Sequence, residues 1–77
     1  MIIDLPYKLA LLGQLKKNWD GYGAKEISEK NIFEAHRVSE LLMSFGMPEP
    51  QYIPCSSGAI QLEWHTKKIE LEILIDE

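Results

Sequence analysis

Two stretches in the first part of the chain repeat apolar residues at helical spacing. The first predicts a helix over about residues 5–17, with Asp4 as its N-cap and Pro6 in its first turn. Gly13 falls inside this helix, where glycine is unfavourable. Either another element approaches closely at this position, or the glycine has no structural role. The second stretch predicts a helix from an N-cap at Ser28 to about Phe45. The apolar stripes are Leu5, Leu9, Leu12, Leu15 and Trp19, and then Ile32, Ala35, Val38, Leu42 and Phe45.

Beyond Gly46 the apolar period changes from helical to two, which indicates strands. Residues 51–53 predict a short strand, and the flanking Pro50 and Pro54 place it at a sheet edge. Residues 59–65 and 68–75 predict a hairpin through a two-residue connection at Thr66-Lys67. Because Thr-Lys suits a tight turn poorly, a longer turn is the alternative. The predicted cross-strand pairs are Trp64–Ile69, Leu62–Leu71, Ile60–Ile73, Glu63–Glu70 and Gln61–Glu72.

We therefore expect residues 1–77 to form a single small α+β domain in the order α-α-β-β-β. The two amphipathic helices should pack on one face of a three-stranded antiparallel sheet. Trp64 should be buried in this core and Trp19 at least partly buried. The opposite face of the sheet is then bare unless a partner covers it.

The formal charge of −4 is unevenly distributed, with +1 over residues 1–38 and −5 over residues 39–77. A net acidic chain repels phosphate backbones, so we expect no direct binding to nucleic acid. The acidic half would attract a basic protein surface, although a merely solvated surface is the alternative. No apolar run reaches the ~18 residues of a membrane span, and residues 1–4 lack the features of a signal peptide. We expect no membrane partner and a cytoplasmic location.

Residues capable of catalysis are few and far apart in the sequence. Cys55 is the single cysteine, which excludes an internal disulfide and leaves no Cys/His cluster for zinc. A nucleophile in the Cys55-Ser56-Ser57 turn would need a base, and His36 and His65 are the histidines available. We expect a protein that is not an enzyme and has no metal or cofactor. A small hydrolase or nuclease component using His36, His65 or the carboxylates is one alternative.

Residues 18–24, Asn-Trp-Asp-Gly-Tyr-Gly-Ala, form the most specific motif of the chain. Its glycines permit positive φ, and Asn18 and Asp20 can bond the nearby backbone, which predicts a rigid turn between the helices. The alternative is a recognition loop in which Asp20 and Tyr22 contact a partner, since aromatic residues are enriched in interface hot spots.

This motif, with Leu15 before it, Ile27-Ser28 after it and Gly-Ala-Ile-Gln-Leu-Glu-Trp at 58–64, resembles a scattered family of small bacterial and phage-borne proteins. Members share an N-W-D-G-x-G-A turn and a later G-x-I-x-L-E-W strand. The resemblance implies a shared fold and an intracellular bacterial or phage setting, but it transfers no catalytic residue. By association with mobile genomes, it suggests an inhibitor, antitoxin, antidefence or anti-CRISPR protein.

The sequence therefore favours a non-enzymatic acidic module that binds another protein and inhibits or regulates it. Glu63, Glu70 and Glu72 share one strand face, and we expect them to meet Lys and Arg side chains of a basic partner. A nucleic-acid-handling protein would present such a surface. The further alternative is a homodimer or homo-oligomeric structural module that hides its spare sheet face against a copy of itself.

Overall fold

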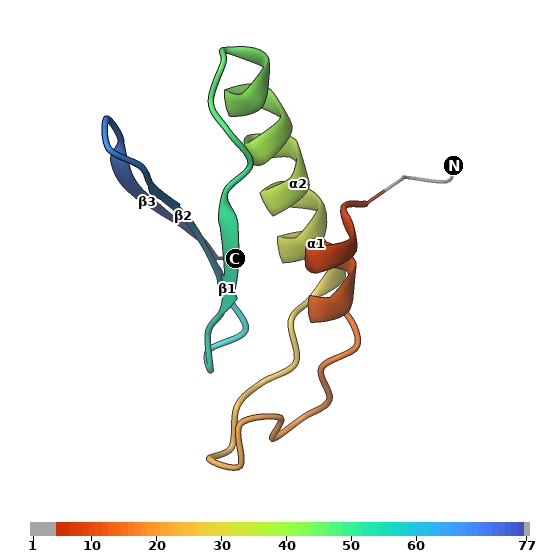
Figure 1. Cartoon of the computed structure of the whole chain (residues 1–77). Coiled ribbons are helices and arrows are strands. Elements are labelled where there is room, and N and C mark those ends of the chain that lie inside the picture. The colour runs from red at the N-terminus through yellow and green to blue at the C-terminus, as the bar shows by residue number, and fades with distance from the viewer. Residues whose placement is uncertain (1–4, 77) are drawn as a thin grey trace.

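A computed structural model of the chain describes residues 5–76 and shows two helices and a three-stranded antiparallel sheet (Figure 1). The predicted α+β class is confirmed. In the sheet, β2 lies between β1 and β3, so the strand after Pro50 is at an edge as predicted. The elements are α1 (Tyr7–Leu12), α2 (Glu29–Ser44), β1 (Gln51–Pro54), β2 (Ile60–His65) and β3 (Glu70–Ile75).

Helix α1 is shorter than the periodicity predicts, because it ends at Leu12 rather than near residue 17. Gly13 is its C-cap, and glycine is the poorest helix former after proline. A Cβ added at Gly13 would lie 3.2 Å from Cδ1 of Ile32, so the missing side chain lets the end of α1 approach α2 closely. Pro6 is the N-cap without a side-chain hydrogen bond, and the predicted cap Asp4 lies outside the described residues.

Helix α2 begins and ends as predicted. The Ser28 hydroxyl oxygen accepts a hydrogen bond from the Asn31 amide at 3.1 Å, and Gly46 follows the helix at a φ of 95°. Neither helix within residues 5–76 has the length and apolar character needed to cross a membrane.

The register of the β2–β3 hairpin is offset by two residues from the predicted one. The pairs include Trp64 with Leu71 and Glu63 with Glu72, so the predicted pairing of Glu63 with Glu70 is wrong. The cause is a longer turn over residues 66–69, closed by a hydrogen bond from the Thr66 amide to the Ile69 carbonyl at 2.8 Å. The Thr66 hydroxyl also accepts a hydrogen bond from the Ile69 amide at 2.9 Å. A shift of two residues leaves every side chain on its predicted face.

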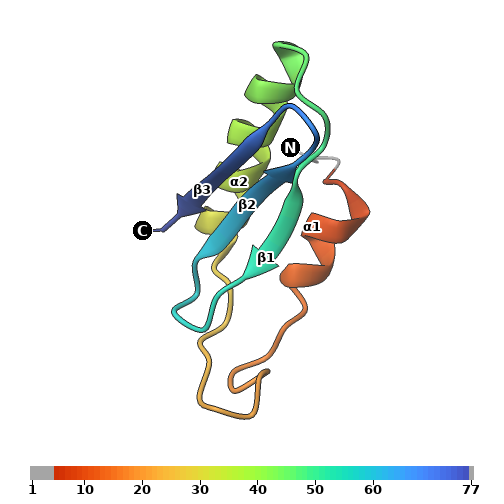
Figure 2. The ribbon, with the colours of Figure 1, turned by 60° about the vertical axis from the view of Figure 1, so that its left-hand side comes forward.

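The helices and the sheet enclose the core between two layers (Figure 2). Helix α2 contacts β2 and β3, and α1 contacts α2 and β1. The Trp64 side chain is 2% exposed, and its indole N–H donates to the Pro48 carbonyl at 2.7 Å. Trp64 is therefore buried as predicted. Other buried core residues are Leu9, Leu12, Ile27, Ile32, Ala35, Tyr52, Ile60, Leu62 and Ile75.

Candidate protein-binding face

The second face of the sheet carries the predicted acidic residues. Strand side chains alternate between faces, so the residues between the core positions of each strand point away from the helices. We call this surface the open face. It comprises Gln51, Ile53, Gln61, Glu63, His65, Glu70, Glu72 and Leu74.

The Gln61 side chain bridges the carboxylates of Glu63 and Glu72, which repel each other. Glu63 lies directly opposite Glu72, and like charges at such positions destabilise a sheet. The Gln61 side-chain amide donates to Glu63 Oε2 at 2.8 Å and to Glu72 Oε1 at 3.1 Å. The structure therefore places Gln61 beside both carboxylates, where it offsets part of their repulsion.

His65 joins the remaining carboxylate to this group. Its Nε2 lies 2.8 Å from Glu63 Oε1, and its Nδ1 contacts Glu70 Oε1. The hydrogen bonds to Glu63 and then Glu70 raise the pKa of His65 above its ordinary value of 6.5, because both carboxylates favour the imidazolium. Glu63, Glu70 and Glu72 thus belong to one connected polar cluster with Gln61 and His65.

An NMR titration of His65 should give a pKa above 6.5, and Glu63→Gln should lower it. A pKa raised by folding contributes stability that is fully present below the unfolded value and is lost as pH rises through the folded pKa. Stability should therefore fall across this window in the parent and fall less in Glu63→Gln. A His65 midpoint at or below 6.5, or one indifferent to Glu63→Gln, would contradict the contacts.

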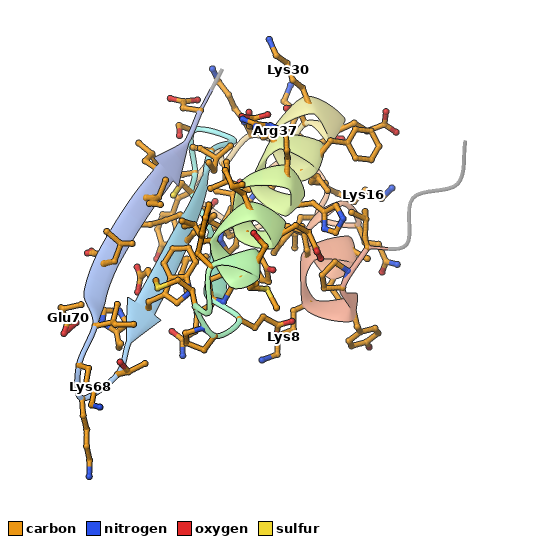
Figure 3. All side chains as sticks on the ribbon, turned by 90° about the horizontal axis from the view of Figure 1, so that it is seen from above. Lys8, Lys16, Lys30, Arg37, Lys68 and Glu70 are labelled. Atoms are coloured by element: carbon orange, nitrogen blue, oxygen red, sulfur yellow. The ribbon has the colours of Figure 1, made fainter. Side chains whose placement is uncertain are left out.

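Four of the cations lie on the helical side of the molecule. Lys8, Lys16, Lys30 and Arg37 surround the helical layer, whereas Glu70 and Lys68 project from the sheet side (Figure 3). Within residues 5–76, neither Lys67 nor Lys68 forms an ion pair with the open-face carboxylates. Three carboxylates of the acidic half, Glu63, Glu70 and Glu72, therefore share one face in three dimensions, whereas Glu40 and Glu49 lie elsewhere.

Apolar side chains adjoin the acidic cluster on the open face. Leu74 is 59% exposed and Ile53 is 39% exposed. Gln61 pairs with both across the strands, so the three residues form a row next to Glu63 and Glu72. Sequence reasoning missed Leu74, Ile53 and His65 as members of this surface, although their strand parity already placed them there.

The motif at residues 18–24 is a loop whose side chains bond its own backbone. Asn18 Oδ1 accepts from the Gly23 amide at 2.6 Å, and the Asn18 amide donates to the Ala24 carbonyl at 2.7 Å. Asp20 Oδ1 accepts from the amides of Tyr22 and Ala24 at 2.8 and 3.1 Å. The carboxylate of Asp20 thus serves the loop itself, as the rigid-turn interpretation expects.

The two aromatic side chains of the loop, Trp19 and Tyr22, differ in exposure. Trp19 is half-buried, and its indole N–H donates to the Lys25 carbonyl at 2.8 Å. Tyr22 is 92% exposed. The loop lies beside the β1–β2 turn through a hydrogen bond from the Lys25 amide to the Ser56 carbonyl. This is the end of the sheet away from the β2–β3 turn (Figure 1), so the structure does not bring Tyr22 and Asp20 together with His65 and Glu70.

The residues considered for nucleophilic chemistry are not joined. No hydrogen bond within residues 5–76 links Cys55 to either histidine; its thiol lies 3.8 Å from the Ile53 carbonyl oxygen. His36 Nδ1 is buried without a hydrogen-bond partner. The described part of the chain shows neither a pocket nor a group of three or more potential metal ligands.

The open face combines a connected group of charged side chains with exposed apolar area. Comparisons with models of protein families, with curated proteins and with solved structures find no match to this chain.

Proposed function

We propose that this protein is a non-enzymatic acidic module that acts in the cytoplasm by binding a basic surface of another protein and inhibiting or regulating it. One observation carries the proposal: Glu63, Glu70 and Glu72 form a connected acidic cluster on the sheet face that points away from α1 and α2. The exposed Leu74 and Ile53 beside them supply apolar area for the same contact.

The cost of this arrangement to folding supports the proposal. A Lys or Thr in place of Glu63 or Glu72 would remove a direct opposition of like charges. A sequence choice that conflicts with local stability is a pointer to function. Such a cluster accelerates association with Lys and Arg side chains and makes binding sensitive to salt. A nucleic-acid-handling protein is a suitable target, because its basic surface already accepts a row of negative charges.

The proposal is tested by replacing the three carboxylates with glutamine at positions 63, 70 and 72. The partner is first captured from source-cell lysate at low salt, purified, and titrated with the parent and with the variant. Three ion pairs with the partner, at about 0.2–1 kcal/mol each, predict a loss of about tenfold in affinity at low salt and a smaller loss at high salt. Above the pKa of His65 the variant should be at least as stable as the parent, because the Glu63–Glu72 repulsion is gone.

A matched control carries the same change in net charge elsewhere. Glu26, Glu40 and Glu49 are exposed and lie outside the open face, so their triple Gln variant also shifts the chain from −4 to −1. It should retain most of the affinity. Equal losses in the two triple variants, or no loss in the first, would remove the open face from the mechanism.

A homo-oligomeric structural module is the second candidate, and the exposed Leu74 and Ile53 favour it. Burying this row against a copy would remove apolar area from water. Light scattering across a range of concentrations separates the candidates, because a partner-binding module remains monomeric by itself.

A further inference from the structure

Strand β3 is an edge strand without the protection that β1 has. β1 spans four residues, ends with Pro54 and follows Pro50, and prolines at an edge discourage pairing with another chain. β3 spans the six residues Glu70–Ile75 and contains no proline. Its outer side therefore offers a row of backbone N–H and C=O groups long enough to pair with a further strand.

The core side of β3 is also incompletely covered. Leu71 points to the helix side opposite Trp64, yet it is 37% exposed whereas Trp64 is 2% exposed. Ile73 is half-buried. Helix α1 contacts β1, at the other edge of the sheet (Figure 2). A strand added beyond β3 would bring apolar side chains onto Leu71 and Ile73.

The open-face side of β3 requires a different chemistry from such a strand. Glu70 and Glu72 are both exposed there and alternate with Leu71 and Ile73. Residues opposite them on an added strand would lie within reach of their carboxylates, and Lys or Arg would complement the charge. The edge thus suits a segment in which apolar and basic residues alternate.

A second copy of β3 does not meet this requirement. In a symmetric antiparallel pair of two β3 strands, both copies keep their helices on the same side of the joined sheet only if one residue lies opposite its own copy. We call this residue the centre of the pair. Centring on Leu71 sets Glu70 against Glu72, and centring on Glu72 sets that residue against its copy. Centring on Ile73 or Leu74 sets Glu70 or Glu72 against Asp76. Centring on Glu70 sets that residue against its copy, and centring on Ile75 pairs only the last residues of β3. Self-pairing along most of β3 therefore opposes carboxylates, which disfavours it.

We propose that β3 binds an extended segment of the partner protein as a fourth strand, with apolar side chains on the helix side and Lys or Arg side chains on the open face. The inference rests on the proposed function and specifies how the acidic face is engaged. Main-chain hydrogen bonds supply affinity in this mode, and the alternating side chains supply specificity.

The test uses the full chain and a synthetic twelve-residue peptide in which Lys and Val alternate. A peptide of the same composition with all lysines before all valines is the control. The alternating peptide should bind about tenfold more tightly, and it should slow amide hydrogen exchange within Glu70–Ile75 but not within β1. Equal binding of the two peptides, or no binding of the alternating one, would overturn strand addition.

N-methylation of the peptide separates strand pairing from charge attraction. The backbone N–H groups that face the protein edge belong to alternate residues, so they lie either on the lysines or on the valines. Methylating one set should weaken binding about tenfold or more, and methylating the other should change it little. If neither methylated peptide loses affinity while binding still depends on Glu70 and Glu72, the strand-addition proposal is wrong, but the proposed role of the acidic face in binding is retained.

A charge exchange in the protein gives a second readout. The variant Glu70→Lys/Glu72→Lys changes two exposed positions and places a cation opposite Glu63, so it should remain folded. It should prefer a peptide of alternating Glu and Val over the Lys–Val peptide by about tenfold. An unchanged preference would overturn the proposal. Protection of the β3 amides that rises with the concentration of the parent protein alone would also overturn it, because it would identify a second copy as the occupant.

Discussion

Trp64→Ala should lower the free energy of unfolding by about 3–5 kcal/mol, the usual loss for deleting a core aromatic side chain. The indole is buried on the central strand and belongs to the core cluster to which both helices and the sheet contribute. Its N–H also donates to the Pro48 carbonyl at 2.7 Å, in the segment that leads into β1. The substitution therefore leaves a cavity and an unpartnered carbonyl.

Urea denaturation measures this loss directly, and Tyr22→Ala is the matched control. Tyr22 is almost fully exposed, so removing its ring should change stability by no more than about 0.5 kcal/mol. For a domain of this length, each kcal/mol corresponds to a shift of roughly 4–8 °C in Tm. A Trp64→Ala midpoint close to that of the parent would show that the indole does not organise the core.

Local patterns in the sequence were sufficient to predict α2 and the strand faces. Ser28 and Gly46 carry the capping chemistry that bounds α2. The strand faces follow from alternation, which any even shift of register preserves. For this reason Glu63, Glu70 and Glu72 were correctly assigned to one face, although the predicted pairing of these residues across the strands was wrong.

Features that depend on tertiary contacts or on turn geometry could not be predicted in the same way. The apolar stripe continues past Gly13, so its period gives no reason for α1 to end at Leu12. The approach to Ile32 that accompanies this ending is a contact between elements distant in sequence. Likewise, the Thr66 hydroxyl sets the longer turn through hydrogen bonds that the residue types permit but do not require.

The candidate site shows the same division. Its carboxylates were predicted, but the cluster around His65 depends on the register, because the two-residue shift moves Glu70 from its predicted place opposite Glu63 to a place opposite His65. The edge at β3 emerged only from strand order and exposure. A pattern of alternation identifies a face, whereas a binding mode also needs the neighbours of each strand.

The β1–β2 turn anchors the 18–24 loop, and its glycine should tolerate substitution least among those with positive φ. Gly58 has a φ of 93°, and a Cβ there would lie 3.0 Å from the Glu26 carbonyl oxygen. The Gly58 carbonyl also accepts a hydrogen bond from the buried Asn31 side chain at 2.9 Å. The turn is therefore held on two sides and has little room to move away.

Gly58→Ala should cost about 1–2 kcal/mol for the left-handed backbone and roughly 1–3 kcal/mol more for the forced contact. Gly23→Ala is its control, because Gly23 has a similar φ of 85° and no atom within 4 Å of an added Cβ. It should show the backbone cost alone. The difference between the free energies of unfolding of the two variants, measured by urea denaturation, gives the cost of the contact. Amide exchange at Lys25 should accelerate only in Gly58→Ala, because that amide donates to the Ser56 carbonyl in the same turn. Equal losses in the two variants would mean that the loop and the turn are not tightly packed.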